Sequence, residues 1–245
     1  MHRTHGRAMT VLAVGAFALV GCGGEPTPEP AAETVAAAEE PARAPALDVT
    51  SDEPMTFFLT SVGVGDGGNL GGLEGADNHC ASLAEAAGAG DREWRAYLST
   101  QEADGQPAVN ARDRIGTGPW HNARGLIIAA DLDALHMDNS NIRYEYALDE
   151  RGETVNSGGM GDSPNMHDIL TGTRMDGTAF PPGDDFTCSN WTSNGEGSAW
   201  VGHHDRITRT TPGGSWNSQH ASAGCGQPSL AQTGGAGLFY CFAAN

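Results

Sequence analysis

The sequence predicts an α+β domain in which long loops connect one or two short helices and a few short strands. Helix signals fall early in this domain and short strand signals fall late, which is typical of α+β folds and not of alternating α/β folds. The 245 residues include 35 glycines, so long irregular connections are expected. Five cysteines are present, and the four after the first lie within residues 54–245. An even number in an exported chain predicts two disulfides, with three pairings open.

The first 22 residues are predicted to be a lipoprotein signal peptide. Arg3 and Arg7 precede an apolar run at 8–20, which is too short to span a membrane but suits a signal sequence. The run ends at Leu19-Val20-Gly21-Cys22, which resembles the bacterial lipobox. Cys22 is then the lipidated N-terminus that attaches the protein to a membrane. An ordinary signal peptide cleaved nearby is the alternative.

Residues 23–53 are predicted to be a disordered tether. This stretch holds five prolines, eight acidic residues and one arginine, a composition that extends the chain and cannot form a core. Gly23 follows Cys22, where an aspartate would signal retention in the inner membrane. We therefore expect an outer-membrane lipoprotein that faces the periplasm or the cell surface, with residues 54–245 as the presented domain.

The charge of the chain excludes several functions. The formal net charge of −18 divides into +2 for the signal peptide, −7 for the tether and −13 for residues 54–245. All 13 basic residues are arginine, so a P-loop lysine and a Schiff-base lysine are absent. Nucleic acid is not an expected partner, because phosphate would be repelled.

The domain is expected to open with a strand, a loop and a helix. Residues 55–65 are β-branched and aromatic, which predicts a strand, and the glycine-dense stretch 66–75 predicts a loop. Residues 79–90 then predict a helix with Asp77 or Asn78 as its N-cap.

The remaining elements are mostly strand candidates. Residues 92–100 predict a second short helix or a strand, and residues 125–130 predict a buried strand. A hairpin turn is expected at 149–152, and a closing strand at 237–243. The shape of 226–237 stays open.

Several stretches resemble the endostatin-type module of the C-type lectin-like superfamily. They are the helix and cysteine at 75–80, the aromatic segment at 94–99, the stretch 170–191, and the cysteine motifs at 222–225 and 238–241. The resemblance implies a C-type lectin-like fold with a small, mainly antiparallel sheet. It also implies disulfides between Cys80 and Cys241 and between Cys188 and Cys225.

The sequence does not favour the known ligands of that superfamily. Heparin-like anionic glycans are not expected, because the domain is strongly acidic. The family's zinc site uses N-terminal histidines, and residues 55–78 contain none. The calcium site of sugar-binding C-type lectins needs a proline triplet with an acid or amide, and Gln227-Pro228-Ser229 lacks the acid.

Another calcium site is the cofactor hypothesis from sequence. Carboxylates and amides on flexible loops are the ligands that Ca²⁺ prefers, and they gather in two loops. The alternative is that these loops are simply solvated. The candidates are Asp66, Asn69, Asp77, Asp184, Asp185 and Glu196.

The region 191–220 is the predicted ligand-binding surface. Aromatic rings beside amide, carboxylate and imidazole groups suit a saccharide. Trp191 is interpreted as a core residue and Trp216 as exposed. The predicted binding residues are Trp200, His203, His204, Asp205, Trp216, Asn217 and His220.

No enzyme is expected, because no HExxH or GxSxG motif occurs. The leading hypothesis is a lipid-anchored recognition or adhesion module for a saccharide or a protein. A structural role in the envelope is the first alternative. A metal-dependent hydrolase is the second, and it would require His203, His204 or His220 to converge on one point.

Overall fold

The computed structural model describes residues 50–137, 140–206 and 214–244. The predicted signal peptide, Cys22 and most of the tether lie outside these ranges. Ser51, near the end of the predicted tether, is bound to the domain: its amide donates to Arg124 and its hydroxyl to Gly125. Within the described ranges, no helix is both long and apolar enough to cross a membrane.

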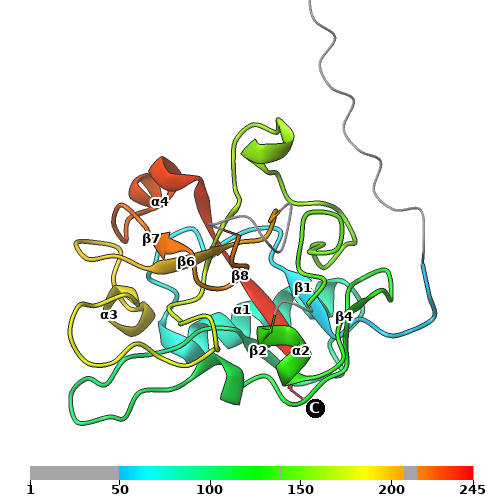
Figure 1. Cartoon of the computed structure of the whole chain (residues 1–245), viewed down its shortest axis with the longest axis horizontal. Coiled ribbons are helices and arrows are strands. Elements are labelled where there is room, and N and C mark those ends of the chain that lie inside the picture. Colours follow the sequence, from blue (N-terminus) through cyan, green and yellow to red (C-terminus); the bar gives the residue numbers. More distant parts are fainter. Residues whose placement is uncertain (1–49, 138–139, 207–213, 245) are drawn as a thin grey trace, which may run out of the picture. The chain divides into compact units, whose positions relative to one another are not determined.

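The fold is α+β, as predicted, with mixed sheets. The main sheet has the order β1-β8-β5-β6-β7, and β2 also pairs with β8 (Figure 1). Its pairings are antiparallel except for β5 with β8, which is parallel. A second, two-stranded sheet pairs β3 with β4. The strands are β1 (Phe57–Leu59), β2 (Trp94–Ala96), β3 (Trp120–His121), β4 (Ile127–Ala129), β5 (Asp168–Leu170), β6 (Trp200–His203), β7 (His220–Ala221) and β8 (Gly235–Ala243).

Strand β8 separates two hydrophobic cores. Side chains alternate across a strand, so Phe239 and Cys241 enter one core while Tyr240 and Phe242 enter the other. Both faces are buried, which explains why this segment is a continuous apolar run. The predicted closing strand is confirmed and begins slightly earlier than expected.

The described helices outnumber the expected one or two. They are α1 (Gly72–Ala86), α2 (Leu132–His136), α3 (Cys188–Trp191) and α4 (Gln227–Thr233). Helix α4 lies in the 226–237 segment whose shape the sequence left open. Residues 92–100 contain strand β2, residues 125–130 contain β4, and the predicted hairpin is closed by a bridge between Leu148 and Thr154.

The predicted start of α1 is wrong. The helix begins at Gly72, after Gly71, so neither Asp77 nor Asn78 caps it. Asp77 instead lies in the helix, on its buried side, with Ala76 and Cys80. A buried carboxylate needs compensating partners, and these come from the chain that follows the helix.

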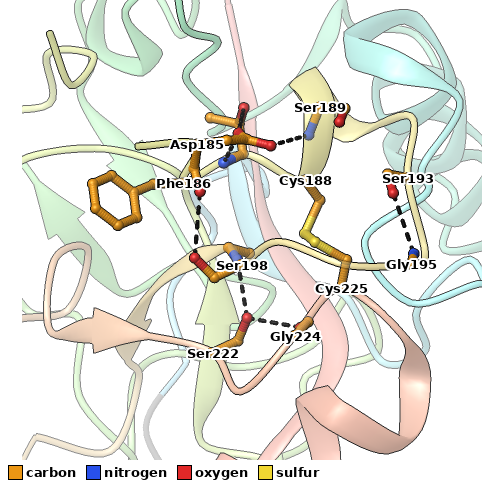
Figure 2. Close-up of a disulfide and its surroundings, with 12 residues drawn as sticks. Asp185, Phe186, Cys188, Ser189, Ser193, Gly195, Ser198, Ser222, Gly224 and Cys225 are labelled. Carbon is orange, nitrogen blue, oxygen red and sulfur yellow. Dashed lines mark hydrogen bonds between the residues drawn. A yellow bond between two sulfur atoms is a disulfide. The ribbon is translucent and has the colours of Figure 1, made fainter. Parts of the chain in front are cut away.

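Both predicted disulfides are present. Cys80–Cys241 joins α1 to β8, and Cys188–Cys225 joins α3 to the segment before α4 (Figure 2). The segment α3 is a left-handed turn, because all four residues from Cys188 to Trp191 have positive φ. Non-glycine residues pay roughly 1–2 kcal/mol each for this conformation. The disulfide and the Asp185 carboxylate, which accepts from the Ser189 amide, hold the turn in place.

Candidate metal centre

Three side chains form a compact cluster at one end of the β5-β6 pair. One potential ligand atom from each of His167, Asp168 and His203 lies within 4.8 Å of the others. Among the described residues, this is the one group of three or more histidine, cysteine or acidic side chains that close together. The Oδ1 atom of Asp168 lies 3.3 Å from Nε2 of His167 and 3.0 Å from Nε2 of His203.

His220 lies beside this group. Its Nε2 atom is 3.1 Å from Nε2 of His203 and 3.5 Å from Oδ1 of Asp168. Three imidazole nitrogens therefore surround a single carboxylate oxygen. Two of the histidines, His203 and His220, belong to the predicted binding set, whereas His167 and Asp168 were not predicted.

Strand register explains why these residues meet. Asp168 pairs directly with His203 across β5 and β6, so the two side chains share one face of the sheet. His220 pairs with Val201, which lies two residues before His203 and on the same face. His167 immediately precedes β5, and its ring stacks on that of His203 with centroids 4.2 Å apart.

The carboxylate at the centre of the cluster is buried without a hydrogen bond. The Asp168 side chain is 1% exposed, and neither of its oxygens has a hydrogen-bond partner. The neighbouring histidine nitrogens are within ion-pair distance of Oδ1 but do not meet hydrogen-bond geometry with it. A buried charge of this kind is unfavourable unless a cation compensates it.

Hydrogen bonds outside the cluster orient two of the imidazoles. Nδ1 of His167 lies 3.1 Å from Oδ2 of Asp205, which also accepts from the Ser157 hydroxyl. Nδ1 of His220 lies 3.0 Å from the carbonyl of Ala221. A ring whose Nδ1 donates keeps the Nε2 lone pair free, and histidine ligands of metals are held in this way.

The charges of the His167–Asp205 pair reinforce this orientation. The hydrogen bond from Asp205 raises the pKa of His167, against the opposing effect of burial. Burial alone would raise the pKa of Asp205, but the hydrogen bonds from His167 and Ser157 hold it below its usual range. Asp205 is therefore a permanent carboxylate behind His167.

His204 does not join the cluster. Adjacent residues of a strand point to opposite faces, and His204 is fully buried, with Nε2 3.4 Å from the carbonyl of Asn156. Its Nδ1 has no hydrogen-bond partner. Burial lowers the pKa of His204 to about 4, so it is neutral at pH 7.

The donor set fits a divalent transition metal. Zinc binds imidazole nitrogens at about 2.0–2.1 Å in a tetrahedral arrangement, which places ligand atoms roughly 3.3–3.4 Å apart. The two distances from Oδ1 of Asp168 to the histidines of the cluster, 3.0 and 3.3 Å, are close to that spacing. Calcium needs six to eight oxygens, and a site made of imidazoles with one carboxylate offers too few. The cluster also differs from the N-terminal histidine site implied by the endostatin resemblance, since its residues lie between 167 and 220.

The predicted exposure of Trp216 is wrong. Trp216 is 3% exposed and packs against Tyr97 and Tyr240, while the Asn217 amide donates to the Tyr97 hydroxyl. The backbone of Trp216 lies so close to Gly202 that a Cβ there would clash with it. The tryptophan side chain is part of the second hydrophobic core. Trp191 is buried, as interpreted.

Trp200 lies away from the histidines. Its ring forms an aromatic group with Phe180 and Phe186, with centroids 4.9–5.1 Å from each. Its indole nitrogen donates to the Ser218 hydroxyl. Of the seven predicted binding residues, the structure therefore brings His203 into the cluster, His220 beside it and Asp205 behind it.

The calcium candidates have different partners in the structure. Asp66 accepts from the amides of Asn69 and Asn194, and Asp185 accepts from Thr187 and Ser189. Asp77 is buried against two arginines. Asp184 and Glu196 are exposed. Calcium binding stays a prediction from sequence, and the cluster at Asp168 is a separate site.

Two surface pockets lie near these residues. One, of about 390 Å³, is lined by Asp205 together with Tyr144 and Tyr146. The other, of about 550 Å³, is lined by Gln101, Asp185 and the left-handed turn. Neither is lined by Trp216 or Asn217.

Comparisons with known proteins do not identify the chain. No protein-family model matches the sequence, and a search of curated proteins finds no match.

Proposed function

We propose that this chain is an exported recognition domain whose binding site contains a divalent transition metal, zinc being the best fit. His167, Asp168 and His203 hold the ion. We further propose that the fold is C-type lectin-like and that Cys22 carries a lipid anchor, so that the tether presents the domain outside the inner membrane. The ligand is a saccharide or a protein.

The observation that carries the metal proposal is the buried carboxylate of Asp168. Three histidine nitrogens lie around it, and neither oxygen is hydrogen-bonded. A metal ion bound by His167, Asp168 and His203 would compensate this charge. The two described disulfides occupy the four cysteines of the domain, so thiolate ligation does not compete. The disulfide pairing and the α+β topology support the lectin-like proposal.

Metal stoichiometry tests the proposal. The purified, oxidised chain is dialysed against micromolar zinc, and the bound metal is measured. We expect one tightly bound zinc per chain in the wild type and loss of that zinc in Asp168→Asn and His203→Ala. His79→Ala is the matched control, because His79 lies on α1 and contacts Val62 and Phe239. Equal zinc content in all four proteins would reject the site.

A metal-dependent hydrolase is the second candidate. It required His203, His204 or His220 to converge, and His203 and His220 do so at 3.1 Å. A zinc ion with a free position lowers the pKa of bound water to about 7 and makes it a nucleophile. Zinc-dependent cleavage of an activated ester, lost in Asp168→Asn, would favour this function over recognition alone.

A further inference from the structure

His220 is held differently from the three residues of the cluster. It stands outside the group of three whose ligand atoms all lie within 4.8 Å of one another. Its side chain is 37% exposed, compared with 21% for His167 and 17% for His203. The ligand set therefore has an inner part and one outer member that faces solvent.

The contacts that hold His167 are also more buried than those that hold His220. His167 is fixed by the buried Asp205 and by stacking on His203. His220 opens β7, a two-residue strand at the edge of the sheet, and its Nδ1 bonds to the carbonyl of the next residue. A side chain held only by local contacts on an edge strand needs less free energy to move than one held by buried neighbours.

The number of protein ligands distinguishes two kinds of zinc site. Sites that act on ligands keep three protein donors and one exchangeable position, whereas structural sites are closed by four. His167, Asp168 and His203 supply three donors. The Nε2 atom of His220 lies 3.1 Å from Nε2 of His203 and 3.5 Å from Oδ1 of Asp168, which makes His220 the nearest candidate for a fourth donor.

We propose that His220 is a displaceable fourth ligand, and that the position it vacates binds a carboxylate group of an external ligand. This inference rests on the proposed metal site. A divalent ion with one carboxylate and neutral imidazoles carries a local charge of +1, which favours a monoanionic oxygen donor. Polyanions such as sulfated glycans are disfavoured, because residues 54–245 carry a net charge of −13.

Cobalt spectroscopy tests the exchange. Co²⁺ takes the place of zinc and reports its coordination through visible absorption. The oxidised full chain is loaded with one equivalent of Co²⁺ as wild type, His220→Ala and His220→Gln, with His79→Ala as the control. We expect all four to bind Co²⁺, with an altered spectrum in the two His220 variants only. Added imidazole should restore the wild-type spectrum of His220→Ala.

Acetate then probes the vacated position. We expect acetate to change the spectrum of His220→Ala at a concentration about tenfold lower than for the wild type, because it no longer competes with the imidazole. Glucuronate and N-acetylglycine, titrated in parallel, distinguish an acidic sugar from a peptide C-terminus as the source of the carboxylate.

The outcomes separate the two proposals. A wild type that binds no Co²⁺ overturns the metal site itself. A wild type that binds Co²⁺, with unchanged spectra and unchanged acetate affinity in both His220 variants, overturns only the displaceable ligand. Complete loss of Co²⁺ from folded His220→Ala and His220→Gln would also overturn it, because His220 would then be an obligatory ligand.

Discussion

Asp77 and Asp168 are both buried acidic residues, but only Asp77 is compensated by hydrogen bonds. Asp77 accepts hydrogen bonds from the guanidinium groups of Arg95 and Arg114 and from the amide of Ala96. Asp168 has no arginine within ion-pair distance among the described residues. It has three imidazoles, and neither oxygen accepts a hydrogen bond.

The difference separates a structural carboxylate from a functional one. Guanidinium groups are always charged, so Asp77 is neutralised as soon as the chain folds, and it ties α1 to β2. An imidazole nitrogen, unlike a guanidinium nitrogen, can present an electron pair to a metal ion. Asp168 is therefore placed to share an external cation with its neighbours.

The largest expected effect is a loss of stability when the buried carboxylate of Asp77 is removed. Asp77→Asn removes the charge while Arg114, whose side chain is 11% exposed, stays buried. Leaving one partner of a buried pair uncompensated costs about 3–5 kcal/mol. Urea unfolding would measure this loss. Asp149→Asn is the control and should lose less, because its partner Arg151 is largely solvated. A loss below about 1 kcal/mol in Asp77→Asn would contradict the assignment.

In the absence of metal, Asp168→Asn should raise the free energy of unfolding, whereas Asp77→Asn lowers it. With EDTA present, Asp168→Asn removes an uncompensated buried charge, so the free energy of unfolding should rise by about 1–3 kcal/mol. Urea unfolding in EDTA measures the change. A marked loss of stability would show that the histidines already compensate Asp168 as cations.

A smaller effect is expected from the carboxylate behind the cluster. Asp205→Asn weakens the hydrogen bond that orients His167, and substitutions of such supporting residues lower metal affinity by about 10–100-fold. Competition with a chromophoric zinc chelator measures the affinity. Asp162→Asn serves as a control, because Asp162 accepts from Tyr144 and Ser157 without touching a cluster histidine. Equal affinities in the two variants would remove Asp205 from the site.

The smallest effect is a pH dependence that is independent of the cluster. Burial lowers the pKa of His136, whose Nε2 lies 2.7 Å from the Tyr97 hydroxyl. Below pH 6.5 the unfolded chain binds a proton at His136 more readily than the folded chain does. The stability contributed by neutral His136 is therefore complete above pH 6.5 and is lost as the pH falls below it.

His136→Gln isolates this contribution. The acid loss of stability between pH 7 and pH 5 should become shallower, by at most about 1.4 kcal/mol per pH unit. Unfolding free energies measured across that range would show it. Parallel profiles for the variant and the wild type would assign the acid loss to other groups.

The parts of the fold that were predicted correctly depend on local patterns. The run 237–243 predicts a strand because it is apolar on both faces, and Asp149-Glu150-Arg151-Gly152 predicts a hairpin turn. The start of α1 was missed because Gly71 and Gly72 were read as loop, although Gly72 begins the helix with positive φ.

The sequence predicts two of the four residues at the site, His203 and His220, but not that they meet. His203 and His220 stand out in the sequence, but their convergence depends on the register of β5, β6 and β7 across loops of many residues. The pair His167-Asp168, directly before the apolar residues of β5, is the signal in the sequence that points to the other half of the site. Trp216 was misjudged because its neighbours in sequence are polar, while its burial depends on Gly202, Tyr97 and Tyr240.

The most direct test of the account is the effect of zinc on stability, measured for the wild type and Asp168→Asn. At a free zinc concentration about 100 times the dissociation constant, the wild type should gain about 2.7 kcal/mol of unfolding free energy. Asp168→Asn should gain nothing, and calcium at the same concentration should not replace zinc at this site. An unchanged wild type, or an equal gain in both proteins, would contradict the proposal that Asp168 and its histidines hold a metal ion.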